Sequence, residues 1–152
     1  MALANYTSFM DAALALAKAA LTVGEVPVGA VVIQNGKIIG RGHNRTRIDH
    51  DPTAHAEIVA IREATGFLDN DRLDDCDLWV TLEPCTMCAG AIAHARIRRL
   101  YYGAGDAKGG AVDSGVRFFD APTCHHKPEV YAGMGEDISA KLLTDFFRGR
   151  RD

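Results

Sequence analysis

Two short segments of this 152-residue chain carry residues whose types and spacing are typical of a metal site. The first contains His55, and the second contains Cys85 and Cys88 at the predicted start of a helix. Because the two cysteines lie one helical turn apart, their sulfur atoms point to the same side, and a helix N-terminus favours the thiolate that binds metals. Two thiolates and one imidazole suit zinc, and three protein ligands leave one tetrahedral position open to water. The sequence therefore predicts one catalytic Zn2+ bound by His55, Cys85 and Cys88.

Glu57 supplies the proton carrier that such a site needs. It closely follows the predicted ligand His55, so its carboxylate can reach the water without being a ligand itself. There it would take a proton from the water and return it to the ring nitrogen and leaving amine of the substrate. The pattern H-x-E followed by P-C-x-x-C is the signature of the zinc-dependent deaminases. We therefore predict that Glu57 is the catalytic acid and base of a hydrolytic deamination.

Each part of this pattern also occurs without catalysis. A C-x-x-C pair alone is as often redox-active or half of a structural zinc site. A lone histidine at a helix start more often caps the helix or packs in a core, and an H-x-E pair alone carries almost no information. The combination, with both parts at predicted helix starts, favours a zinc hydrolase.

The chain also resembles the bacterial tRNA-specific adenosine deaminases, which are members of the cytidine/deoxycytidylate deaminase superfamily. The resemblance covers nearly the whole chain and is carried by EVPVGAVV (25–32), GHNRT (42–46), DPTAHAEI (51–58), VTLEPCTMCAGAI (80–92), GAGDAKGGAVDS (103–114) and DFFRGRR (145–151). It implies a cytidine-deaminase-like fold, one zinc ion per subunit and a homodimer. It also implies conversion of adenosine to inosine at the wobble position of a tRNA anticodon, with the tRNA anticodon loop as partner and no organic cofactor.

The resemblance further implies a set of substrate-binding residues. Asn44 would hydrogen-bond the flipped base, and the backbone at Ala56 and Val26 would wall the pocket. Asp106 and Lys108 would contact sugars and phosphates of the anticodon loop.

The elements that must position these residues follow from hydrophobic periodicity and turn signals. We expect an opening helix capped by Ser8 (8–21), a hairpin with a type I′ turn at Asn35-Gly36 (28–33 and 37–41), and a glycine-rich loop (103–123). The other expected elements are helices at 53–64, 85–95 and 138–148, and strands at 77–82, 97–102 and 129–132. Strands that alternate with helices after a hairpin predict a three-layer α/β/α sandwich with a central mixed five-stranded sheet.

Three other functions remain as alternatives. A deaminase of a free nucleobase or nucleoside, of the guanine or cytosine type, would use the same zinc ligands. An RNA-binding subunit without turnover would be expected to lose Glu57, and a redox or metal-storage module would leave Glu57 and Asn44 without a role. The loop at 103–114 and the basic residues Arg148, Arg150 and Arg151 favour RNA.

Two features near the C-terminus allow weaker expectations. Cys124, His125 and His126 could by composition form a second metal site, but we favour a mobile loop near the substrate. Phe146 or Phe147 is expected to anchor the last helix to the sheet.

Composition bounds the remaining possibilities. A chain that is 47% hydrophobic and 24% charged is typical of a globular protein, and we expect residues 1–152 to form a single deaminase domain. The apolar stretches at 12–23 and 26–33 are too short or too interrupted to span a membrane, and the N-terminus lacks the pattern of a signal peptide. We therefore expect a cytoplasmic protein with no membrane partner, in which the four cysteines are not disulfide-bonded.

Overall fold

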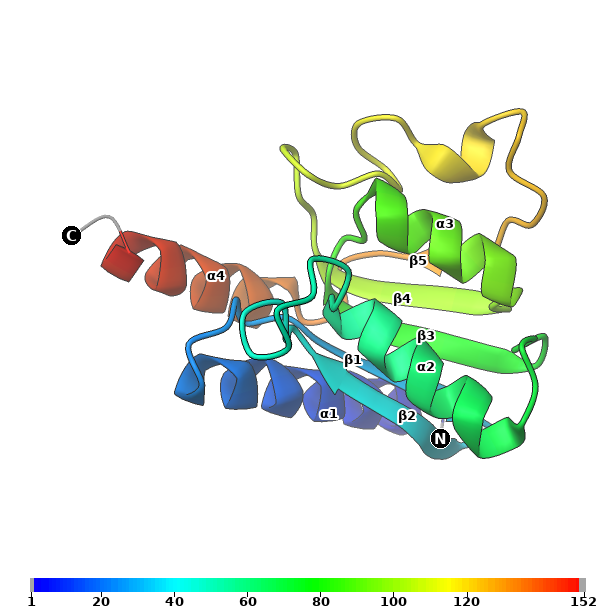
Figure 1. Cartoon of the computed structure of the whole chain (residues 1–152), viewed down its shortest axis with the longest axis horizontal. Helices are drawn as coiled ribbons and strands as arrows, with labels where there is room; N and C mark the ends of the chain where they lie inside the picture. Colours follow the sequence, from blue (N-terminus) through cyan, green and yellow to red (C-terminus); the bar gives the residue numbers. More distant parts are fainter. Residues whose placement is uncertain (1, 151–152) are drawn as a thin grey trace.

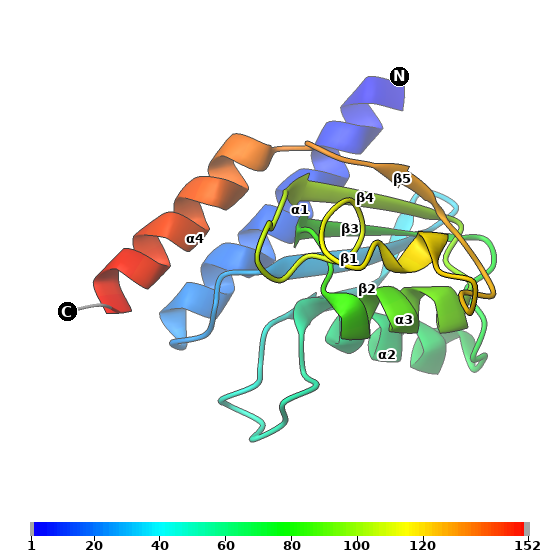
Figure 2. The same ribbon diagram turned by 90° about the horizontal axis from the view of Figure 1, so that it is seen from above.

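A central five-stranded sheet lies between two pairs of helices (Figure 1). The computed structural model describes residues 2–150, with the side chains of residues 9–149. The elements follow one another as α1 (Ala2–Thr22), β1 (Gly29–Gln34), β2 (Lys37–His43), α2 (Ala56–Leu68), β3 (Cys76–Leu82), α3 (Thr86–Ala95), β4 (Arg99–Ala104), the 3-10 turn η1 (Phe118–Asp120), β5 (Glu129–Tyr131) and α4 (Glu136–Arg150). Seen from above, α1 and α4 cover one face of the sheet, and α2 and α3 cover the other (Figure 2).

The sheet is mixed, with the strand order β2-β1-β3-β4-β5. Strand β1 pairs antiparallel with both β2 and β3, whereas β3, β4 and β5 run parallel. This arrangement confirms the predicted α/β/α sandwich. Because β3 and β4 are parallel and Leu82 pairs with Ala104, the segments that follow the two strands leave the sheet at the same edge.

Alternate residues of each strand supply two separate cores. Val32, Leu78 and Leu100 face α2 and α3, while Trp79 and Tyr101 face α1. Within the described residues, no helix is long and apolar enough to cross a membrane.

Helix α2 lies directly on the backbone of β2. A Cβ atom at Gly42 would lie 2.5 Å from the carbonyl oxygen of Ala56 and 2.7 Å from the nitrogen of Ala60. Only glycine in the strand, facing alanines in the helix, allows this approach. The contact fixes the first turn of α2, and therefore the position of the residues around its start.

The hairpin turn is of the predicted type. Asn35 and Gly36 have φ angles of 51° and 77°, and a type I′ turn requires positive φ at both central residues. The turn sets the pairing of Gln34 with Lys37.

Several predicted boundaries were wrong. Helix α1 begins at Ala2, so Ser8 lies inside it and not at its start, and β4 begins at Arg99 instead of residue 97. Helix α2 begins at Ala56 instead of residue 53, because both the backbone N–H and the hydroxyl of Thr53 donate to Asp51 Oδ1 and form a turn there.

The anchor of the last helix also differs from the prediction. Leu142 and Leu143 of α4 pack against the two cores, whereas Phe147 is 49% exposed. The Phe146 ring lies edge-on to Phe147, with ring centres 5.3 Å apart. Of the three C-terminal arginines, Arg151 lies outside the described residues and Arg150 is described only in its backbone.

Candidate active site

The starts of α2 and α3 bring His55, Cys85 and Cys88 together, as predicted. His55 Nδ1 lies 3.6 Å from Cys85 Sγ and 3.5 Å from Cys88 Sγ, and the three ligand atoms all lie within 4.8 Å of one another. His55 and Cys85 each occupy the N-cap position of their helix with extended backbone, and neither side chain caps its helix. Both side chains point instead toward the other ligands, which excludes a capping role for His55. We call these three residues the metal cluster.

The metal cluster has the chemistry and spacing of a tetrahedral site. With metal–nitrogen and metal–sulfur bonds of about 2.0 and 2.3 Å, tetrahedral ligand atoms lie about 3.5 Å apart. The observed nitrogen–sulfur distances of 3.6 and 3.5 Å match this value. The residues present therefore fit an ion of this size, and three ligands leave one position for water. In the described part of the chain, this is the one group of three or more such residues that could hold a metal.

Hydrogen bonding distributes charge unevenly within the cluster. The hydrogen bond from the Cys88 thiol, with a smaller contribution from His55, lowers the pKa of Cys85 to about 4. The same bond to Cys85, together with burial, raises the pKa of Cys88. The bond to Cys85 raises the pKa of His55, with a smaller contribution from the charge of Glu57. The cluster thus holds at least one thiolate at the end of α3, where the helix dipole also favours it.

Glu57 lies in the first turn of α2 beside the metal cluster but outside it. Its side chain is 4% exposed, and burial raises its pKa to about 7. A carboxyl group with this pKa accepts and returns protons at neutral pH, as a general acid and base must.

The structure links Asn44 to Ala56, two of the residues expected around the substrate. Asn44 Oδ1 accepts a hydrogen bond of 2.8 Å from the Ala56 backbone N–H. This bond fixes the orientation of the Asn44 amide at the start of α2. Val26 packs against the core cluster that contains Ala56.

Asp106 and Lys108 lie in the segment that follows β4, at the same edge of the sheet as Cys85. Asp106 Oδ1 accepts hydrogen bonds from the backbone N–H groups of Lys108 and Gly109, at 3.1 and 3.0 Å, so its carboxylate shapes the turn. The Lys108 side chain is exposed.

Cys124, His125 and His126 lie far from the metal cluster, at the other end of α3. His126 Nε2 lies 2.6 Å from the Ile97 carbonyl oxygen, and Arg96 donates to the His125 carbonyl. The expectation that this segment lies near the substrate was therefore wrong. The segment is attached to Arg96 and Ile97 just after α3, Cys124 Sγ bonds to the His126 carbonyl, and no second metal site forms within the described residues.

Two buried glutamates at the site were not identified from the sequence. Glu25 is 1% exposed and accepts hydrogen bonds from the backbone N–H groups of Arg47 and Ile48, and Glu83 is 2% exposed. The sequence does contain an indication of both, because each acid lies next to an apolar stretch. A carboxylate that is buried there needs hydrogen-bond donors around it.

Several known proteins are similar to this chain in sequence and in structure. A family model of MafB19-like deaminases matches residues 4–151. The tRNA-specific adenosine deaminase of Agrobacterium fabrum (strain C58) is 58% identical over 149 residues, which cover 98% of each chain. A solved structure from a study of A-to-I editing by tRNA:A34 deaminases is 60% identical with a TM-score of 0.89, covering 90% of this chain and 99% of that one. Guanine deaminase from Bacillus subtilis is 33% identical with a TM-score of 0.64, covering 95% and 93%.

The three-layer fold and the metal cluster with its adjacent glutamate are those of a deaminase. Nearly the whole chain is matched by the family model, and the relatives named for tRNA are far more similar than the guanine deaminase. The chain belongs to the family of the tRNA-specific adenosine deaminases.

Proposed function

We propose that this chain is a zinc-dependent enzyme that hydrolyses adenosine to inosine and ammonia at the wobble position of a tRNA anticodon. The observation that carries the proposal is the meeting of His55, Cys85 and Cys88 beside the buried Glu57, in a chain 58% identical to a tRNA-specific adenosine deaminase. We infer zinc from the donor set of one imidazole and two thiolates. Bound there, the ion supplies a Lewis acid that makes water nucleophilic at neutral pH.

Glu57 moves the protons of the reaction. It takes one proton from the attacking water and delivers it to the purine ring nitrogen. It then moves the remaining proton of the added hydroxyl group to the amine, which leaves as ammonia while the ring carbon becomes the carbonyl of inosine. The burial of Glu57 supports this role, because its pKa of about 7 lets the carboxyl group exist in both forms at neutral pH.

The neighbouring residues bind and orient the base. The Asn44 amide, fixed by the bond from Ala56, donates to the base, while the backbone at Val26 and Ala56 walls the pocket. Asp106 and Lys108 contact sugars and phosphates of the anticodon loop. Moving an unpaired loop base out of its stack costs less free energy than extruding a paired base, which favours an anticodon loop over a duplex.

Assembly, domain content and location are further parts of the proposal. The resemblance supports a homodimer with one zinc per subunit, and the match over nearly the whole chain supports a single deaminase domain. A tRNA substrate supports a cytoplasmic location.

The test is inosine formation on an anticodon stem-loop with adenosine at the wobble position. Guanine, cytosine and adenosine are assayed in parallel for ammonia release, and Glu57→Ala is the matched inactive variant. We expect inosine at that one position with the wild type and none with the variant. Ammonia from a free base with the RNA untouched would overturn the tRNA assignment and favour a free-base deaminase.

A further inference from the structure

The Glu83 carboxylate joins two segments of the site by five hydrogen bonds. Its Oε2 atom accepts from the backbone N–H groups of Val112, Asp113 and Ser114, at 3.1, 2.9 and 2.9 Å. Its Oε1 atom accepts from the Asp106 N–H at 2.9 Å and from the Ser114 hydroxyl at 3.0 Å. Hydrogen bonds to an ionised acceptor are stronger than neutral ones, and here they are shielded from water.

The position of Glu83 in the chain gives these bonds their importance. Glu83 and Pro84 form the connection between β3 and the metal-cluster residue Cys85. The Ala111 N–H donates to the Pro84 carbonyl at 2.9 Å, and the Glu83 N–H donates to the Ala104 carbonyl at 2.8 Å. The segment from 106 to 114 is therefore attached directly to the turn that carries a metal ligand.

The fit around this carboxylate leaves no spare space on its inner side. A Cβ atom at Gly110 would lie 2.4 Å from the carboxyl carbon of Glu83 and 2.5 Å from the Asp106 carbonyl oxygen. A side chain at Gly110 would thus have to displace either the carboxylate or the backbone.

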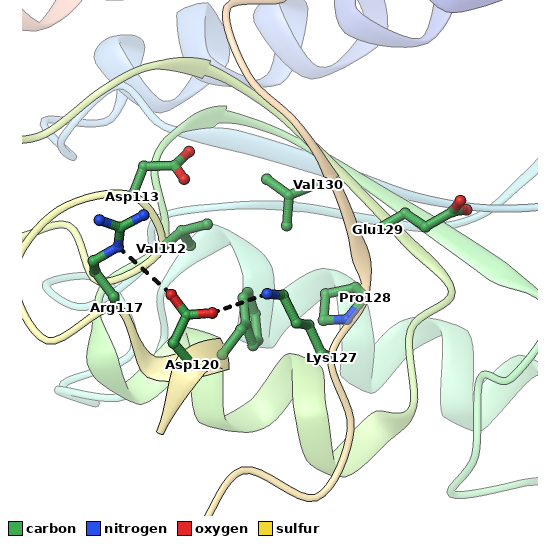
Figure 3. A pocket seen from close by; sticks show the side chains of 9 residues that line it. Val112, Asp113, Arg117, Asp120, Lys127, Pro128, Glu129 and Val130 are labelled. Atoms are coloured by element: carbon green, nitrogen blue, oxygen red, sulfur yellow. Dashed lines mark hydrogen bonds and ion pairs between the residues drawn. The ribbon is translucent and has the colours of Figure 1, made fainter. Parts of the chain in front are cut away.

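On another side, the same segment borders a cavity. The cavity has a volume of about 470 Å3. Val112 and Asp113 line it together with Asp120 and its partners Arg117 and Lys127 (Figure 3). None of the metal-cluster residues lines it. On this side the segment is held by the hydrogen bond from the Tyr102 hydroxyl to the Asp113 carboxylate and by the buried Val112 side chain, while the five bonds to Glu83 hold its inner side.

We propose that Glu83 is a positioning residue. It holds residues 106–114 against the turn that carries Cys85 and thereby presents Asp106 and Lys108 to the RNA. This inference rests on the proposed function. None of the five hydrogen bonds of Glu83 goes to Glu57 or to a residue of the metal cluster. The loss of Glu83 therefore changes RNA binding more than it changes the chemical step.

The experiment compares Glu83→Gln, Glu83→Ala and Gly110→Ala. Glutamine keeps one carbonyl oxygen, which serves three N–H groups, but its NH2 group opposes the Asp106 N–H. Alanine leaves every donor without its acceptor, and Gly110→Ala pushes the segment away while Glu83 stays intact. Gly66→Ala is the matched control, since no atom lies within 4 Å of the added Cβ.

The readouts are KM and kcat on the stem-loop, zinc content and amide hydrogen exchange of residues 105–115. For Glu83→Gln we expect a rise in KM of about tenfold, the scale of one buried N–H left without a partner. We expect kcat and zinc content to stay near wild type, faster exchange in this segment, and a larger effect for Glu83→Ala. Gly110→Ala should reproduce the rise in KM, and Gly66→Ala should not.

Two results would overturn the proposal. One is unchanged exchange and unchanged KM in Glu83→Gln, and the other is a loss of kcat at constant KM, which would place Glu83 in the chemical step. If the wild type itself does not edit the stem-loop, the proposed function fails. The exchange data then decide by themselves whether Glu83 holds the segment.

Discussion

The contact between β2 and α2 makes Gly42→Ala a sensitive test of how the site is built. The added Cβ would lie 2.5 Å from the Ala56 oxygen, 2.7 Å from the Ala60 nitrogen and 2.9 Å from the Val59 Cβ. Two of these neighbours are backbone atoms of α2, so no side-chain rotation relieves the clash. The helix has to move outward, and His55 at its N-cap moves with it.

The expected magnitude combines two opposing contributions. Overpacking in a well-packed core costs about 1–3 kcal/mol. Replacing glycine restricts the unfolded chain and returns about 0.4–1 kcal/mol. We therefore expect Gly42→Ala to lower the free energy of unfolding by about 1–2 kcal/mol, or the urea midpoint by about 0.5–1 M for a slope near 2 kcal/mol/M.

The assay is urea unfolding followed by far-UV circular dichroism at one fixed concentration of free zinc, because a bound ligand adds to stability. Gly66→Ala, which adds a methyl group to α2 in open space, should instead stabilise by up to about 1 kcal/mol. The two substitutions thus differ in sign although the chemical change is identical. The reasoning would be refuted if Gly42→Ala matched the wild type, or if Gly66→Ala were equally destabilised.

The remaining predictions concern the chemistry. Glu57→Ala should keep the fold and the zinc but lower kcat by at least about 10²–10⁴-fold, measured as inosine formed per minute; retained turnover would remove Glu57 from the mechanism. Cys88→Ala should lose zinc, measured by atomic absorption, because two ligands remain. Burial raises the pKa of Cys76 to about 12, so iodoacetamide at pH 8 should label it only after unfolding, and mass spectrometry of the native protein checks this. Lys108→Ala should reduce the slope of log Kobs against log salt for stem-loop binding by about 0.7, the value for one single-strand phosphate contact, and an unchanged slope would argue against that contact.

Residues that act through local spacing could be predicted from the sequence. His55 with Glu57, and Cys85 with Cys88, each lie within one helical turn, so their geometry follows once a helix start is recognised. The alternation of strands and helices likewise predicted the layers and the mixed sheet.

What could not be predicted depends on contacts between distant segments. The donors to Glu83 lie 23 to 31 residues away in the chain, and nothing near them identifies their acceptor. The start of α2 was misplaced because Thr53 can cap a helix or close a turn on Asp51, and its side chain does the latter. The role of His126 could not be predicted from composition either. A histidine that bonds to a backbone carbonyl and a histidine that binds a metal are indistinguishable in the sequence.

The aromatic residues on the α1 face of the sheet affect how this protein can be observed. Trp79, the only tryptophan in the sequence, is buried and stacks on Tyr101 with ring centres 4.0 Å apart. Tyr101 in turn stacks on Tyr131 of the edge strand. The intrinsic fluorescence of the protein therefore reports the layer between α1 and the sheet, whereas the metal cluster lies in the layer of α2 and α3. A partial opening of the layer formed by α2 and α3 would leave the tryptophan emission almost unchanged. The emission would therefore report global unfolding but would not detect local unfolding around the metal cluster.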